Sequence, residues 1–133
     1  MIKRILLALF VSLFIYGIAN AVNTITCQGD PNVYQTCTIT LDATGDVCYA
    51  VKDTTQHSAL FDFTSGTIAV NWQASINGAP TGGESIDLLG SDVAADAWET
   101  QNIITPGWLC FSVVTCTTCV MTIYATSAGA NNE

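Results

Sequence analysis

Apolar and polar residues alternate most regularly over residues 67–76, and this pattern predicts a half-buried β-strand, because successive side chains of a strand point to opposite faces. The positions on one face are all apolar: Ile68, Val70, Trp72, Ala74 and Ile76. Asn77 and Gly78 form a turn dipeptide that ends the strand. Residues 59–63 precede it across a short Thr-Ser-Gly segment, and we expect them to be its hairpin partner.

Similar patterns predict shorter strands elsewhere. Residues 38–41 and 47–52 flank a turn cluster, and residues 85–89 form a short apolar run after a Pro- and Gly-rich loop. Residues 91–101 fit either a short helix capped by the Ser or Asp at its start, or an irregular crossover between sheets. About eight short strands with frequent turns predict an all-β fold, an antiparallel two-sheet β-sandwich held by disulfides.

The last apolar stretch predicts a hairpin of residues 108–115 and 120–126, joined by a Cys-Thr-Thr-Cys turn. One face of this hairpin would carry Cys110, Ser112, Val114, Met121, Ile123 and Ala125. The other face, the predicted apolar assembly face, would carry Leu109, Phe111, Val113, Val120 and Tyr124. A half-exposed antiparallel hairpin usually has one polar face. We therefore expect the second apolar face to be covered by another segment of the chain or by another subunit.

Residues 1–21 have the three parts of a secretory signal peptide: a basic start, an apolar run and small residues before a cleavage site after Ala21. The apolar run is shorter than the roughly 20 residues of a spanning helix, so no membrane span is expected in the mature chain. Residues 127–133 are small and polar and are predicted to be a flexible tail. Residues 22–126 then form one secreted domain.

Loss of the signal peptide changes the charge balance. Lys52 remains as the only basic residue against eleven carboxylates, one positive charge against eleven negative ones, which gives a formal charge of −10. Nucleic-acid binding depends on Lys and Arg at the phosphates, so nucleic acid is excluded as a partner. Anionic membrane surfaces are excluded for the same reason.

Six cysteines in a short exported chain predict three disulfides. Mirror-image strands on either side of residues 28–36 predict the bond Cys27–Cys37. The turn between the last two cysteines predicts Cys116–Cys119. Cys48 and Cys110 remain and are expected to form the third bond. A redox pair at the Cys-Thr-Thr-Cys stretch is the alternative, but strand-forming flanks without a basic residue give no stabilised thiolate. Zinc needs about four ligands, and one such pair with one His supplies too few.

No catalytic motif is present, and the protein is not expected to be an enzyme. His57 is the only histidine and lies in a polar stretch predicted to be an exposed loop. The chain has no nucleophile-elbow, phosphate-loop or zinc-protease motif. A glycosidase needs two carboxylates placed across a cleft, for which a small sandwich has little room.

Calcium is the one candidate cofactor. Acidic residues occur in two pairs, each four positions apart, and oxygen-rich loops of this kind bind calcium: Asp42 and Asp46, and Asp92 and Asp96. Neither pair fits the spaced twelve-residue calcium loop, and turn aspartates often bond to the backbone instead.

The first functional hypothesis is an extracellular filament or pilus. The residues after the signal peptide form a strand-like segment, the predicted assembly strand: Val22, Asn23, Thr24, Ile25 and Thr26. A free terminal strand can complete the open sheet edge of a neighbour. With its signal ending at Ala21, this strand and an almost Lys-free sandwich, the chain resembles secreted archaeal and bacterial pilins that assemble by donor-strand exchange. The resemblance implies self-association into a homo-oligomer or filament.

The second hypothesis is a secreted binding module for carbohydrate. Trp72, Trp98 and Trp108 are the tryptophans available to stack on sugar rings. Trp72 belongs to the apolar face of its strand and is expected in the core. Trp98 lies in a polar stretch and is the candidate for ligand stacking.

Overall fold

The computed structural model of the protein describes residues 22–51, 54–76, 85–102 and 107–129. Strands are the only regular secondary structure in this part of the chain, which has no helix: β1 (Thr24–Asp30), β2 (Tyr34–Leu41), β3 (Gly45–Ala50), β4 (Thr54–Ser75), β5 (Ser85–Asp87), β6 (Ala97–Asn102) and β7 (Trp108–Gly129). The predicted antiparallel all-β fold is confirmed. Seven strands are seen among the described residues instead of about eight, because two of them contain 22 residues each.

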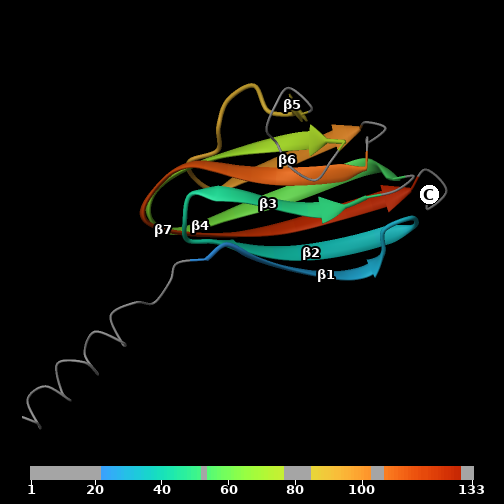
Figure 1. The fold of residues 1–133 in the computed structure, drawn as a ribbon, viewed down its shortest axis with the longest axis horizontal. Coiled ribbons are helices and arrows are strands. Elements are labelled where there is room, and N and C mark those ends of the chain that lie inside the picture. The colour runs from blue at the N-terminus through green and yellow to red at the C-terminus, as the bar shows by residue number, and fades with distance from the viewer. Residues whose placement is uncertain (1–21, 52–53, 77–84, 103–106, 130–133) are drawn as a thin grey trace, which may run out of the picture.

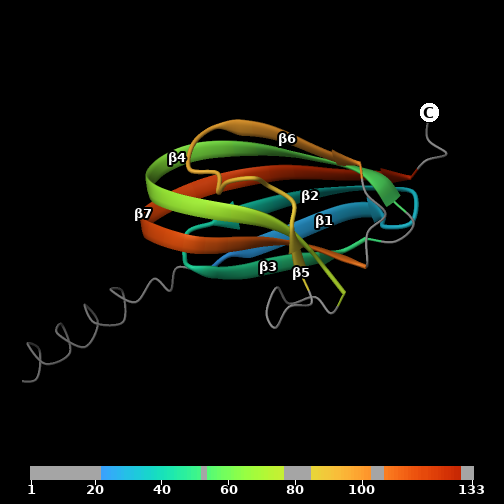
Figure 2. The same cartoon turned by 90° about the horizontal axis from the view of Figure 1, so that it is seen from above.

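The two long strands β4 and β7 organise the molecule (Figure 1). They pair antiparallel along their length, and both bend near their middle. One hydrogen-bonded sheet therefore folds back into two layers, as Figure 2 shows from above. The first layer has the order β1-β2-β7-β4-β6 and the second the order β3-β7-β4-β5, with different halves of β4 and β7 in each.

Two predicted hairpins are wrong, because each is one continuous strand. Residues 59–63 and 67–76 lie in line along β4, apart from Ile76, which follows its end. The Thr-Ser-Gly segment between them bends the strand, with register shifts on both sides of Ser65 and a φ of 81° at Gly66. The backbone of both halves hydrogen-bonds to β7. The two halves therefore do not pair with each other, and the chain does not reverse its direction between them.

The second apparent hairpin is β7, whose side chains alternate between core and surface on each side of the bend. At the bend itself the alternation is broken, because Thr115 and Thr117 are exposed and Cys116 packs against the core. Its inward positions are all buried: Leu109, Phe111, Val113, Cys119, Met121, Ile123 and Ala125. β7 thus has a single core face, and the expected pair of apolar faces does not exist. In the predicted apolar assembly face, Leu109, Phe111 and Val113 lie in the core, whereas Val120 and Tyr124 point outward.

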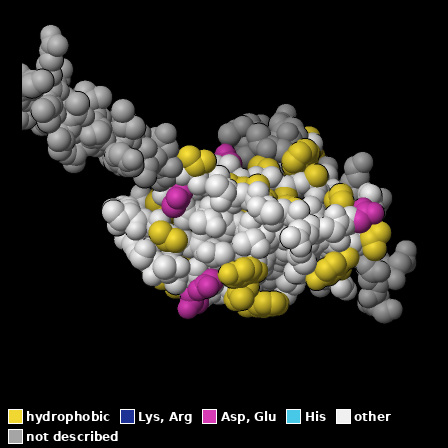
Figure 3. Space-filling model, turned by 90° about the horizontal axis from the view of Figure 1, so that it is seen from below, with side chains coloured by type: hydrophobic (Ala, Val, Ile, Leu, Met, Phe, Trp, Pro, Cys, Tyr) yellow, Lys and Arg dark blue, Asp and Glu magenta, His cyan; other side chains and the backbone are white. Residues whose placement is uncertain are grey.

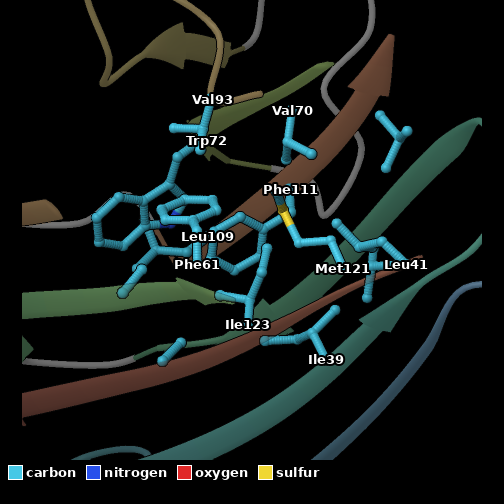
Figure 4. Packing of buried hydrophobic residues seen from close by; sticks show 14 of the residues in the cluster. Ile39, Leu41, Phe61, Val70, Trp72, Val93, Leu109, Phe111, Met121 and Ile123 are labelled. Atoms are coloured by element: carbon cyan, nitrogen blue, oxygen red, sulfur yellow. The ribbon is translucent and has the colours of Figure 1, made fainter. Parts of the chain in front are cut away.

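The core lies between the layers and centres on Phe111 (Figure 4). Its ring stacks on Trp72 at 5.6 Å between centroids and meets Phe61 edge-on at 5.7 Å. Tyr49 stacks on it from β3 at 6.1 Å. Aromatic pairs with these separations add to the stabilisation from burial alone. The two layers are therefore held together by side chains from β3, β4 and β7.

The three predicted disulfides are confirmed: Cys27–Cys37, Cys48–Cys110 and Cys116–Cys119. The first joins β1 to β2 and the second joins β3 to β7, each between residues directly opposite in the ladder, with Cα atoms 4.1 Å apart. The third lies at the bend of β7 and not in a hairpin turn. Three such bonds fit an extracellular or otherwise oxidising compartment.

The end of the domain lies further along the chain than predicted. β7 continues to Gly129, so residues 127–129 belong to the sheet and not to a tail. Ser127 is buried, and the Gly129 amide donates to the Val33 carbonyl at 2.9 Å. These backbone bonds and the buried serine explain why small polar residues stay in the strand. The predicted signal peptide, residues 1–21, and the last four residues lie outside the described part.

The ambiguous segment of residues 91–101 is a crossover that leads into a strand. Val93 forms an isolated bridge with Val70 before β6 begins at Ala97, so no helix forms in this segment. Within the described residues, no helix is long and apolar enough to cross a bilayer.

Candidate ligand-binding face

The outer face of the first layer, which points away from the second layer, carries its side chains in rows across the strands. One row, called the central row, runs over β6, β4, β7, β2 and β1: Trp98, Leu60, Tyr124, Thr38 and Thr26. Each member is the direct ladder partner of the next. Directly opposed side chains contact one another, so the row is a continuous line.

Three neighbours in the central row are large, apolar and open to solvent. Trp98 is 64% exposed, Leu60 38% and Tyr124 47%. Because strands are about 4.8 Å apart, these three Cα atoms span about 10 Å. We call them the apolar strip. Adjacent exposed side chains of this size form a ready contact surface, and Trp and Tyr add a polar atom at the ring edge.

Hydroxyl-bearing rows lie on both sides of the central row. One contains Thr100, Ser58, Thr126, Thr36 and Gln28, and the other contains Asp62, Thr122, Thr40 and Thr24. Asp62 is the only charged member of these three rows. Figure 3 shows the molecule from below, on the side where β1 lies in Figure 1, and there the acidic side chains form separate spots with uncharged atoms between them. The outer face thus offers hydroxyl groups around an apolar strip, a mixture found in small-molecule sites.

The other tryptophans occupy different places. Trp72 is fully buried, as expected for a core residue. Trp108 is 36% exposed and lies at the start of β7, in the second layer. Sequence reasoning identified Trp98 but missed Leu60 and Tyr124 as its neighbours. The alternation of apolar and polar residues over 121–126 was the available signal for Tyr124.

The predicted assembly strand is part of this layer. Thr24, Ile25 and Thr26 pair with β2 along the ladder. The Asn23 side-chain oxygen accepts bonds from the amides of Asp42 at 3.0 Å and Ala43 at 3.1 Å, which fastens the segment to the β2–β3 turn. Val22 remains 57% exposed. The segment is therefore not a free strand in this structure.

The candidate calcium ligands are dispersed. Asp96 accepts a bond from the Phe63 amide at 2.7 Å, so this carboxylate serves the backbone. Asp92 and Asp46 are exposed, and Asp42 is partly buried at the β2–β3 turn. Among the described residues, no three His, Cys, Asp or Glu side chains gather closely enough to hold a metal ion. Calcium binding stays a prediction.

A cluster of polar side chains lies inside the core. His57 is not in an exposed loop, as predicted, but in β4, where it is 1% exposed with Nδ1 2.9 Å from the Ser127 hydroxyl. A serine beside a histidine is an arrangement used in nucleophilic catalysis. Both side chains are 1% exposed, so a substrate does not reach them in this structure.

Tyr49 lies near this buried pair. Burial raises the pKa of Tyr49 well above its usual value, and the nearby polar groups of Trp72 and Ser127 only partly oppose the rise. Within the described residues, no hydrogen bond of normal geometry reaches its hydroxyl. The tyrosine is therefore held neutral, and its hydroxyl lacks a good partner.

No protein-family model and no curated protein matches the chain. Several solved structures resemble it in fold. A cupin domain from Bordetella pertussis is 10% identical with a TM-score of 0.45, over 86% of this chain and 100% of that one. An RmlC-like cupin protein from Desulfovibrio desulfuricans is 14% identical with a TM-score of 0.40, over 84% and 92%.

A third similar structure is the mitogen from Yersinia pseudotuberculosis, which is 9% identical with a TM-score of 0.40, over 84% of this chain and 91% of that one. At such identities the likeness concerns the fold alone. The chain's own strands and disulfides show an all-β, disulfide-bonded domain.

Proposed function

We propose that the protein is an exported binding module that holds a neutral carbohydrate on the outer face of its first layer. The observation that carries the proposal is the apolar strip of Trp98, Leu60 and Tyr124, three direct ladder neighbours that are all exposed. The apolar face of a sugar ring stacks on such side chains, and its hydroxyls bond to polar groups at the side. Thr38, the exposed next member of the central row, supplies such a group beside Tyr124.

Charge supports a neutral ligand. The described residues include no Lys or Arg, so nothing on this face would pair with a sulfate, phosphate or carboxylate. The acidic balance of the chain repels anionic polymers. A cation would find only Asp62 within the three rows. Stacking and hydroxyl bonding are therefore the interactions that this face offers.

The test compares two tryptophan variants. Trp98→Ala removes the most exposed member of the apolar strip, and Trp108→Ala is the matched control on the second layer. Truncation of a central binding residue costs about 2 kcal/mol or more, which is roughly thirtyfold in affinity. In a screen of neutral glycans followed by calorimetry, Trp98→Ala should lose at least this much and Trp108→Ala almost nothing. No binding of any glycan, or equal losses in both variants, would refute the proposal.

A second candidate function is self-assembly into an extracellular filament, favoured by the edge strand β1. Six of its seven residues are exposed, and it contains no Lys, Arg or Pro. Edge strands without such residues readily pair with another strand. Here the added strand would bind along the outer side of β1, since Thr24 to Thr26 are already paired within the chain.

Assembly is tested by light scattering over a range of concentrations, with electron microscopy of the native secreted fraction. Gln28→Lys puts a charge on the β1 edge, and Gln56→Lys puts the same charge on the interior strand β4. Fibres or oligomers that Gln28→Lys alone abolishes would support the edge. A monomer at every concentration would dismiss this function and leave the binding module untouched.

A further inference from the structure

The central row extends well beyond the apolar strip. Tyr124 lies opposite Thr38, and Thr38 lies opposite Thr26. Both threonines are exposed on β2 and β1. With about 4.8 Å between strands, the five residues extend about 19 Å across the layer. The apolar strip is thus one end of a longer line that finishes at the β1 edge.

Along β4 and β7, the outward side chains next to the apolar strip are less suited to a neutral ligand than those of the central row. On β4, the outward residue after Leu60 is Asp62, an exposed carboxylate. On β7, Thr122 and Thr126 flank Tyr124 at about 6.8 Å, and both are partly buried. On β6, Thr100 follows Trp98 and is also exposed and uncharged, but that path leaves the apolar strip at its first member. From Leu60 and Tyr124, only the path across the strands continues over side chains that are exposed and uncharged.

The Cys27–Cys37 bond holds the far end of the row in place. It joins residues directly adjacent to Thr26 and Thr38, between ladder partners. A slip of β1 by one residue would turn Thr26 to the opposite face of the layer. The covalent bond prevents such a slip, although β1 is an edge strand.

We infer that the central row takes a linear neutral glycan of several units, lying across the strands from Trp98 to Thr26. This inference rests on the proposed function and adds the form and direction of its ligand. One end of the glycan stacks on the apolar strip. The following units exchange hydrogen bonds with the Thr38 and Thr26 hydroxyls.

The experiment measures affinity by calorimetry for two probe series, β-1,4-linked oligomers of glucose and of N-acetylglucosamine, from a single unit to six units. Affinity should rise with length and level off once the row is spanned. Thr38→Val and Thr122→Val form a matched pair, since both remove a hydroxyl beside Tyr124, one across the strands and one along β7. Thr38→Val should weaken the longer oligomers about 2- to 10-fold and leave the shortest unchanged. Thr122→Val should change neither.

Three outcomes would contradict the inference, and they differ in their consequence for the proposed function. Affinity that depends on Trp98 but not on length confines the ligand to the apolar strip, and the proposed function survives. Equal losses in Thr38→Val and Thr122→Val mean that the chain does not run across the strands. Absence of binding throughout both series overturns this inference, and the wider glycan screen then decides the proposed function. Circular dichroism confirms that each variant is folded.

Discussion

Replacement of Gly66 by alanine should destabilise the protein by about 3 kcal/mol, because this residue lies where the sheet folds into two layers. Its φ of 81° is strained for an L side chain, at about 1–3 kcal/mol. A Cβ there would also lie 2.6 Å from the carbonyl oxygen of Thr117 and against that of Thr118. The Cys116–Cys119 bond restrains this part of β7, and forced overpacking adds about 1–3 kcal/mol. Restriction of the unfolded chain recovers about 0.4–1 kcal/mol.

Two other glycines separate the cost of backbone strain from the cost of the steric contact. Gly107 has a φ of 127°, but a Cβ added there would meet no atom within 4 Å, so Gly107→Ala tests backbone strain alone. Gly90 has neither a positive φ nor a neighbour within 4 Å. We expect a loss of about 1 kcal/mol for Gly107→Ala, and no loss or a gain below about 1 kcal/mol for Gly90→Ala.

The assay is urea unfolding of the oxidised proteins, followed by circular dichroism and tryptophan fluorescence. A shift of the midpoint at constant slope reports stability directly. If Gly66→Ala loses no more than Gly107→Ala, the close approach of the two bends is not a constraint, and the reasoning about the fold-back is wrong.

Further predictions concern the core and the disulfides. Phe111→Ala should cost about 3–5 kcal/mol in the same assay, because its ring contacts three others. Tyr49→Phe should change stability by less than about 1 kcal/mol near neutral pH, since the hydroxyl lacks a well-formed bond. The raised pKa of Tyr49 means that the unfolded chain releases this proton first, so stability should fall above pH 10 by up to about 1.4 kcal/mol per pH unit, and less steeply in Tyr49→Phe. Removal of the Cys48–Cys110 bond, which spans 62 residues, should lower the free energy of unfolding by about 4 kcal/mol. Removal of Cys27–Cys37, which spans 10 residues, should lower it by about 3 kcal/mol.

Strand content and disulfide pairing were predictable from sequence because both depend on local pattern. The alternation around Trp72 marks a strand whatever its partner is. The mirror-image flanks of Cys27 and Cys37 place them opposite each other, and the two-residue spacing pairs Cys116 with Cys119. Cys48 and Cys110 then remain. His57 shows the limit of such reasoning: its polar neighbours face outward from β4, while the ring itself points into the core.

The connection between the strand halves was not predictable, because Thr-Ser-Gly and Cys-Thr-Thr-Cys suit a reversal as well as a bend. The choice depends on pairing between β4 and β7, which are far apart in sequence. The candidate site depends on the same long-range register, since Leu60 meets Tyr124 and Trp98 only through it. Trp98 could be identified alone, as an aromatic residue among polar ones, but its neighbours could not.

The covalent structure also bears on the choice between binding and strand exchange. A strand donor must leave its own sheet, and β1 would have to break its ladder with β2 while Cys27–Cys37 still ties it there. The segment before Cys27 is short, and Asn23 fastens it to the β2–β3 turn. For a ligand on the central row the same bond is favourable, because a row that is already ordered loses little entropy on binding. Reduction of Cys27–Cys37 should therefore weaken the binding of long glycans. If the protein works by strand exchange, the same reduction should promote its assembly.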